Sequence, residues 1–409
     1  MQFGTFSPFQ IPRPWDEGSE TTAYQNALAH VELCDRLGFS HAWAMEHHFL
    51  EEYSHSSAPE IFLAACSQIT RKIRLGHGVV LMPSGYNHPA RVAERLGVLD
   101  VISNGRVEWG TGEGSSAMEL DGFSIPLASK RTHWEEGVTE CARMMTMNPY
   151  PGFEGTSFSM PCRNIVPKPV QKPHPPLWLA CSNRESIKRA ARLGMGAMTF
   201  AFVDPEDAKE WVDDYYRIIK EECVPIGATV NANIMMVTGL SVHNDAAEAV
   251  RRGGDGFNFF NYALHHYYAF GSYKPGRTDL WKEYESARGK IPPAGAERGI
   301  GTPGELRKYL RKFESAGVDQ IAFIPQCGRV THEHVCESLM LFASAVMPEF
   351  RDRHEARASR KAEELAPFIA AALERKQRID PVKDEEIPEV AALGRRIVDQ
   401  GRASKMAQS

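Results

Sequence analysis

The chain has 409 residues, of which 43% are apolar and 24% are charged, ordinary proportions for a globular protein with a full-sized core. Its 47 basic and 52 acidic residues give a net charge of −5, a balance that disfavours nucleic-acid binding. The N-terminus lacks the basic start and apolar run of a signal peptide, and no stretch has the roughly 18 apolar residues that span a bilayer. The eight cysteines form no CxxC pair, so they indicate neither a zinc ribbon nor a disulfide scaffold. We therefore expect a cytoplasmic protein without nucleic-acid or membrane partners.

Short apolar strands alternate with longer amphipathic segments, as in a parallel sheet crossed by helices. Eight strands are predicted, at about 2–6, 41–46, 73–81, 106–110, 176–181, 196–200, 230–240 and 319–324. Eight strands with helices between them fit a closed (β/α)8 TIM barrel better than an open doubly wound sheet.

Local signals mark several boundaries of these elements. Asn104-Gly105 is a turn dipeptide just before the fourth strand. Asp204-Pro205 supplies an N-cap and a first residue for a helix at 205–222. Thr302-Pro303-Gly304-Glu305 has the spacing of a capping box, and Gly317 ends the helix that it starts.

Three segments depart from simple alternation. Residues 148–176 are rich in proline and predict an excursion with at most a short hairpin. Residues 244–300 form a long insertion before the last helix–strand unit. The charged tail from Arg351 predicts a helix to about Arg375, kinked or split at Pro367 and followed by a break at Pro381. We divide the chain into a barrel, 1–350, and a helical tail, 351–409.

The first cluster with reactive side chains is Glu46-His47-His48-Phe49, at the end of the second strand. In a barrel of this kind the reactive face lies at the carboxyl ends of the strands. Two histidines and a carboxylate there can transfer protons near neutral pH, bind a metal, or merely satisfy loop carbonyls. Later strand ends, at Cys181 and Phe200, offer no His or Asp ligands, so we assign no metal ligands.

The second cluster is Ala180-Cys181-Ser182-Asn183-Arg184-Glu185, where the fifth strand meets a helix that Gly194 closes. Ser182 and Glu185 have capping-box spacing, which predicts that Ser182 starts the helix. Free N–H groups at such a terminus can hold a phosphate, although most capping boxes bind nothing.

Two further motifs are weaker. Trp109-Gly110-Thr111-Gly112-Glu113-Gly114-Ser115 follows the fourth strand, where glycine lets a flat ligand approach the backbone. The run lacks the context of a dinucleotide-binding fingerprint. His332-Glu333-His334-Val335-Cys336 looks like a metal cluster, but His332 and His334 are two apart and cannot share a helical face, so we interpret it as structural.

Together these residues resemble the bacterial luciferase-like flavin monooxygenase family over about residues 1–350. Glu46-His47-His48-Phe49 matches the family's second-strand motif. The remaining matches, in chain order, are Leu81-Met82-Pro83 with His88-Pro89, Leu99-Asp100 with Gly105-Arg106, the proline-rich 167–176, and Ala316-Gly317-Val318-Asp319.

The resemblance implies a barrel that binds reduced FMN supplied by a separate NAD(P)H-dependent flavin reductase. With oxygen, the flavin would form a C4a-peroxide that oxygenates a small organic substrate. His47 would be the acid/base residue and His48 its neighbour in the pocket that Glu46 also lines. Val79, after Gly78, falls where the family often has a non-proline cis peptide beneath the flavin ring.

The resemblance also implies where the flavin binds. Ser182 and the following N–H groups, with Ala180, Asn183 and Arg184 beside them, correspond to the phosphate site. Gly112 belongs to the cofactor side of the fourth strand, and Arg131 matches a basic residue near the phosphate. Glu113 departs from the family because luciferase has an arginine there, and a carboxylate would repel phosphate.

Competing functions remain open at this level. They are an F420-dependent oxidoreductase of the same superfamily, a non-catalytic flavin-binding relative, and a metal-dependent barrel hydrolase. The family commonly forms dimers or tetramers, so we expect a homo-oligomer.

The insertion and the tail each carry an expectation of their own. Ten of the 39 aromatic residues lie between Phe257 and Tyr284, which predicts either a mobile cover over an apolar or aromatic substrate or a small subdomain with its own core. The tail's apolar stripe of Leu365, Phe368, Ile369 and Leu373 predicts packing on the barrel or on a second subunit, with a disordered end as the alternative.

Overall fold

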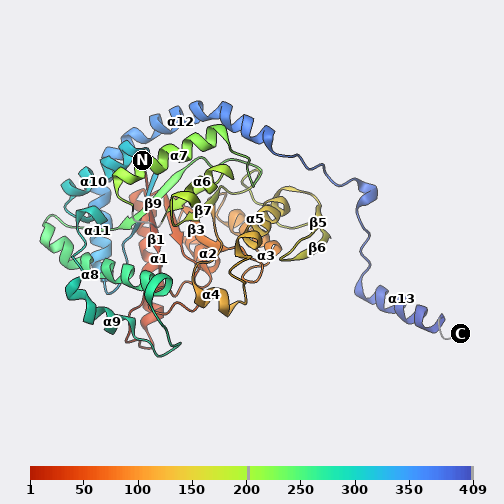
Figure 1. Ribbon diagram of the computed structural model, residues 1–409, viewed down its shortest axis with the longest axis horizontal. Helices are drawn as coiled ribbons and strands as arrows, with labels where there is room; N and C mark the ends of the chain where they lie inside the picture. Colours follow the sequence, from red (N-terminus) through yellow and green to blue (C-terminus); the bar gives the residue numbers. More distant parts are fainter. Residues whose placement is uncertain (200–202, 407–409) are drawn as a thin grey trace.

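Eight parallel strands close into a barrel in the computed structural model, which describes residues 1–199 and 203–406 (Figure 1). Their order around the barrel is β1-β12-β9-β8-β7-β4-β3-β2. The strands are β1 Gln2–Ser7, β2 His41–Ala44, β3 Arg74–Leu81, β4 Val107–Gly112, β7 Leu177–Cys181, β8 Gly196–Thr199, β9 Ile234–Gly239 and β12 Gln320–Ile324. The predicted (β/α)8 barrel is therefore confirmed.

One strand begins at a different residue from the one that the sequence predicted. The strand expected at 230–240 begins only at Ile234, because Asn231 and Asn233 form a turn in which the Asn233 N–H donates to the Asn231 carbonyl (3.0 Å). Asn231 Nδ2 also donates to the carbonyl of Leu177 (2.9 Å), which fixes this turn to the neighbouring strand. Phe200, the predicted end of another strand, lies outside the described residues.

An outer layer of helices surrounds the barrel. Its main members are α1 Ser19–Leu37, α2 Pro59–Ile69, α3 Pro89–Ile102, α5 Lys130–Thr146, α6 Arg184–Arg192, α7 Pro205–Glu221, α8 Ala246–His265, α10 Pro303–Ala316 and α11 His332–Ala345. The capping box predicted at Thr302 is confirmed, since its side chain accepts from the N–H of Glu305 and Gly317 caps the other end of α10 with φ of 100°. None of the described helices is long and apolar enough to cross a membrane.

The cap of α6 is not the predicted one. Asn183, and not Ser182, is the N-cap, and its side chain accepts from the N–H of Ser186 (3.0 Å). Ser186 Oγ accepts in return from the Asn183 N–H (3.1 Å). The box is thus shifted by one residue, because β7 continues to Cys181 and leaves Ser182 in the exposed connection.

The insertion and the proline-rich excursion have defined structure. The excursion contains the short antiparallel hairpin β5 Tyr150–Glu154 and β6 Ser159–Arg163. The insertion contains α8, a π-helix at His266–Phe270, and α9 Leu280–Ala287, followed by the short helices at Arg288–Lys290 and Ala296–Arg298. The small parallel pair β10 Ser241–Val242 and β11 Ile300–Gly301 joins its two ends. A short helix, α4 Ala117–Gly122, follows β4.

The tail forms one long helix, α12 Met347–Arg375, which begins before the predicted boundary at Arg351 and lies along α7 (Figure 1). Pro367 lies inside this helix without splitting it, contrary to our expectation of two short helices. Contacts on both sides of the proline explain this. Lys361 Nζ donates to Asp319 Oδ1 (2.7 Å), and Arg375 Nη1 donates to the carbonyl of Cys223 (3.0 Å).

The chain beyond α12 runs away from the barrel. It contains a short helical turn at Asp384–Glu386 and ends in α13 Leu393–Met406, which was not predicted and lies far from the other helices (Figure 1).

Candidate active site

The loop between β2 and α2 carries the histidine pair at the carboxyl end of the barrel. The His47 N–H donates to the carbonyl of Ser56 (2.9 Å), and Ser56 Oγ donates to the carbonyl of Met45 (2.6 Å). These bonds close the loop on itself directly after β2. The backbone of His47 is therefore held at the rim where substrates reach TIM barrels.

His47 is paired with a carboxylate from another element. Its Nδ1 lies 3.0 Å from Oε1 of Glu119 on α4, and the N–H of His48 donates to the same oxygen (3.0 Å). The Glu119 side chain is 1% exposed, whereas that of His47 is 18% exposed. A buried carboxylate fixes Nδ1 as the donor, which leaves Nε2 as the nitrogen that can exchange a proton with a ligand. This is the arrangement of a general acid/base.

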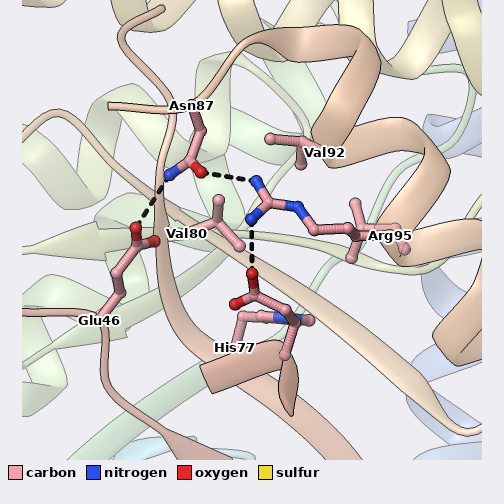
Figure 2. A pocket seen from close by; sticks show the side chains of 8 residues that line it. Glu46, His77, Val80, Asn87, Val92 and Arg95 are labelled. Carbon is pink, nitrogen blue, oxygen red and sulfur yellow. Dashed lines mark hydrogen bonds and ion pairs between the residues drawn. The ribbon is translucent and has the colours of Figure 1, made fainter. Parts of the chain in front are cut away.

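His48 joins a chain of polar groups behind the rim. Its Nε2 lies 3.1 Å from Glu46 Oε1, which also accepts from Asn87 Nδ2 (2.9 Å). Figure 2 shows this chain from Glu46 through Asn87 to Arg95. Glu46 Oε2 accepts from the N–H of Leu81 (2.8 Å), and Asn87 Oδ1 accepts from Arg95, whose guanidinium pairs with Glu60. Glu46 is therefore held by three donors, and its role is to orient His48 and the end of β3.

Aromatic side chains form a wall next to His47. Its ring centroid lies 5.2 Å from that of Tyr53 and 6.5 Å from that of Tyr268, which belongs to the insertion. Burial raises the pKa of both phenols, with the charge of Glu119 acting in the same direction, so both stay neutral. Tyr86 Oη is buried without a hydrogen-bond partner among the described residues. The wall is aromatic and carries the hydroxyl groups of these tyrosines.

Val79 and Gly112 lie side by side on neighbouring strands. The Gly78–Val79 bond is cis and is the non-proline cis bond of the described chain, at the position that the sequence predicted. A Cβ on Gly112 would come within 2.6 Å of Val79 Cγ2. Gly112 is thus required because a side chain there would collide with Val79 on the neighbouring strand.

The α6 N-terminus is open to solvent. Ser182 and Asn183 are both exposed, and Ala180 is half-buried at the end of β7. The Arg184 side chain turns away, because it pairs with Glu210 (2.8 Å) and Asp214 (2.7 Å) of α7. Only the backbone N–H of Arg184, and not its guanidinium, is in place to contact an anion at this terminus.

Basic side chains surround Glu113 and offset its negative charge, so this carboxylate need not repel a phosphate. Arg189 Nη2 donates to its Oε1 (3.2 Å), and Arg131 Nε lies 3.5 Å from its Oε2. Lys130, which donates to the carbonyl of Gly114, also faces this carboxylate, and its pKa is lowered mainly by burial. Arg189 Nε is buried without a hydrogen-bond partner among the described residues. Three basic side chains therefore lie around one carboxylate.

Sequence reasoning missed several of these residues. Glu119, Tyr268 and Arg189 lie far from the histidine motif in the chain, and none belongs to a motif of its own. Only a signal that links positions far apart in the sequence would have identified these three residues. The aromatic enrichment of the insertion predicted a cover over the substrate or a separate subdomain, and Tyr268 of the insertion lies beside His47.

Comparisons with known proteins identify the family to which the chain belongs. A profile of the family described as luciferase-like monooxygenase matches residues 1–320. The uncharacterized protein y4wF of Sinorhizobium fredii is 33% identical over 261 residues, which cover 61% of this chain and 72% of that protein. The oxygenase component of a flavin-dependent trigonelline monooxygenase of Acinetobacter baylyi is 23% identical over 377 residues, 86% of this chain and 96% of that one.

Solved structures share the fold. Monooxygenase RslO1 of Streptomyces bottropensis superposes with a TM-score of 0.70 at 26% identity, covering 86% of this chain and all of that one. The oxygenating constituent of the Pseudomonas putida 3,6-diketocamphane monooxygenase, in complex with FMN, gives 0.66 at 17% identity over 85% and 98% of the chains. An F420-dependent secondary alcohol dehydrogenase gives 0.63 at 18% identity over 84% and 98%, a likeness of fold. The chain therefore belongs to the luciferase-like monooxygenase family and is an oxidoreductase that uses molecular oxygen.

Proposed function

We propose that this chain is the oxygenase component of a two-component, FMNH2-dependent monooxygenase that acts on a small apolar or aromatic substrate. The observation that carries the proposal is the His47–Glu119 pair, held at the barrel rim beside an aromatic wall (3.0 Å). The relative that is 23% identical over nearly its full length and is named as an oxygenase component supports a two-component arrangement.

The residues present fit a flavin with a terminal phosphate. The N–H groups at the start of α6, Ser182, and the surplus charge of Arg131 and Arg189 would hold the phosphate. The carboxyl ends of β3 and β4, with Val79 and Gly112, would lie beside the ring. When bound, reduced FMN supplies the electrons that no side chain can deliver to oxygen.

The protein's own residues would then manage protons and water. His47 would take up or release a proton at Nε2, and Glu119 would hold the ring in the tautomer that allows this. His48, fixed by Glu46, would line the same pocket. Tyr53 and Tyr268 would present an apolar surface that excludes water from the reacting atoms.

A cofactor titration tests the proposal. Purified protein is titrated anaerobically with FMN, FMNH2 and reduced F420, and oxygen uptake is then followed with an NAD(P)H-dependent flavin reductase present. We expect the tightest binding for FMNH2 and oxygen uptake that depends on the reductase. Preferential binding of reduced F420 without oxygen uptake would instead indicate hydride transfer, and flavin binding without uptake would indicate a non-catalytic relative.

We propose a cytoplasmic homo-oligomer, a dimer or a tetramer. Neighbouring outer helices α2 and α3 expose several large apolar side chains, Ile61, Ile69, Val98, Val101 and Ile102. A second copy of this face would cover them. The molar mass in solution tests this, and Ile61→Glu, at a side chain 70% exposed in the single chain, should yield monomers.

A further inference from the structure

A cluster of two histidines and one cysteine lies between two outer helices, α1 and α11. His30 comes from α1, and His332 and Cys336 come from α11. Their nitrogen and sulfur atoms all lie within 4.8 Å of one another. In the described part of the chain this is the one group of three or more His, Cys, Asp or Glu side chains close enough to share a metal ion.

The helix geometry explains why the sequence did not reveal this cluster. His332 and His334 are two residues apart and point to different sides, but His332 and Cys336 are four apart and share one face of α11. The third member, His30, is about three hundred positions away. It meets them because β1 pairs with β12, which brings the helices that follow these strands, α1 and α11, together.

The distances are close to those of a tetrahedral site. His30 Nε2 lies 3.0 Å from His332 Nδ1, and Cys336 Sγ lies 3.9 Å from that same nitrogen. Zinc bonds of about 2.0–2.1 Å to nitrogen and about 2.3 Å to sulfur place neighbouring ligand atoms roughly 3.3–3.6 Å apart. The His30–His332 and His332–Cys336 distances therefore need to change by only a few tenths of an ångström. The ligand atoms of His30 and Cys336, which lie within 4.8 Å of each other, would approach by up to about 1.3 Å.

The exposure of the three side chains suits a metal site. His30 is buried, at 7% exposed. Cys336 and His332 are only half-buried, so an ion can reach them.

We propose that His30, His332 and Cys336 bind Zn²⁺ or a similar borderline-soft divalent ion, with water as the fourth ligand. Two imidazoles and a thiolate favour such ions over Mg²⁺ and Ca²⁺, which prefer oxygen. The ion would link α1, which follows β1, to α11, which follows β12. It would thereby hold the N-terminal and C-terminal parts of the barrel together. This role is separate from the flavin chemistry at His47.

Metal titration of the full chain tests the site. After removal of metals with a chelator, the protein is titrated with Zn²⁺ and with Co²⁺, whose thiolate charge-transfer absorption reports a sulfur ligand. We expect one ion per chain, loss of that absorption in Cys336→Ser, and at least about tenfold weaker Zn²⁺ binding in His332→Ala. Zn²⁺ should raise the melting temperature of the wild type but not that of His332→Ala.

Matched variants guard against binding elsewhere. His334→Ala, on the same helix, and Cys162→Ser, in the β5–β6 hairpin, should bind Zn²⁺ and Co²⁺ as the wild type does. His30→Gln gives a second test if Cys336→Ser fails to fold. Equal affinity in His332→Ala and His334→Ala, or no stoichiometric binding, would overturn the proposal. FMN affinity, measured on the same samples, should not change, so failure here would leave the proposed monooxygenase function untouched.

Discussion

His47 is the side chain on which the proposed chemistry depends. Replacing it by Ala should leave FMN affinity within a few fold, because the phosphate would be bound at α6. Coupled oxygenation should fall by about two to four orders of magnitude, the usual loss for an acid/base group. Reduced flavin still meets oxygen, so hydrogen peroxide should replace product. Product and peroxide are measured together, with His334→Ala as the histidine control.

Glu119 should act through His47 and not on the substrate. Glu119→Gln keeps the size of the side chain but replaces the carboxylate that faces His47 Nδ1. We therefore expect a shifted pH profile of kcat, with a smaller rate loss than His47→Ala and unchanged FMN affinity. A rate loss with no change in the pH profile would contradict this positioning role.

Ser182 should matter for cofactor binding alone. Ser182→Asp adds a negative charge beside the α6 N-terminus, which should weaken FMN binding by about five- to thirtyfold, corresponding to roughly 1–2 kcal/mol. Turnover at saturating FMN should stay near the wild-type rate. Fluorescence titration measures the affinity, and Ser315→Asp, an exposed site on α10, controls for net charge. Equal weakening in both variants would contradict a phosphate site at Ser182.

The insertion, at the scale of an element, is tied to the histidine loop by two adjacent glutamates. Glu51 accepts from the hydroxyl of Tyr267 at its carbonyl (2.5 Å) and from the N–H of Gly276 at its Oε1 (2.8 Å). Glu52 accepts from the N–H groups of Leu280 (2.7 Å) and Trp281 (3.1 Å), which begin α9. Phe257, Phe259, Phe260 and Tyr284 are buried, so α8 and α9 share a packed core, whereas residues 271–277 are mostly exposed. If the insertion contains a mobile cover, that cover is therefore the exposed stretch 271–277 together with the π-helix His266–Phe270, which carries Tyr268.

Limited proteolysis tests the cover. We expect cutting within 266–280 of the wild type, slower cutting with FMN and substrate, and faster cutting in Glu52→Ala. Glu285→Ala, exposed on α9, is the control. A rate of proteolysis that flavin and substrate leave unchanged would contradict a lid and favour the subdomain interpretation.

Helix α12 should contribute to the stability of the protein, whereas α13 should not. Leu365 is 3% exposed against the body, and Lys361 Nζ donates to Asn233 Oδ1 (2.6 Å) as well as to Asp319. Removing residues 351–409 should therefore lower the melting temperature by several degrees, whereas removing 378–409 should change it little. An unchanged melting temperature and molar mass after the larger truncation would contradict this.

The whole molecule should lose stability in mild acid. Burial lowers the pKa of His30, His77 and His174 to about 4, against 6.5 for an exposed histidine. The unfolded chain therefore binds more protons than the folded chain between these values, so stability is highest above pH 6.5 and falls as the pH drops toward 4. Each histidine contributes up to about 1.4 kcal/mol per pH unit. Urea unfolding at pH 7, 6 and 5 measures this, and equal stability at pH 7 and 5 would contradict it.

Local patterns in the sequence determined the fold class and the first half of the site. Strand and helix periodicity, capping residues such as Thr302, and the Glu46-His47-His48 motif act over a few residues, so they can be recognised without coordinates. The one-residue shift of the α6 cap and the unbroken α12 show where this fails. In both cases neighbouring elements, β7 and the barrel surface, outweighed the local preference.

Only the tertiary structure decided which distant residues meet. Glu119 reaches His47, Arg189 reaches Glu113, and His30 reaches His332 because barrel closure brings separate turns of the chain to one place. The sequence therefore determined that a barrel with a histidine pair at the end of its second strand would form. The carboxylate that orients His47, the cations that neutralise Glu113, and the cluster between α1 and α11 depend on long-range packing, which no local pattern encodes.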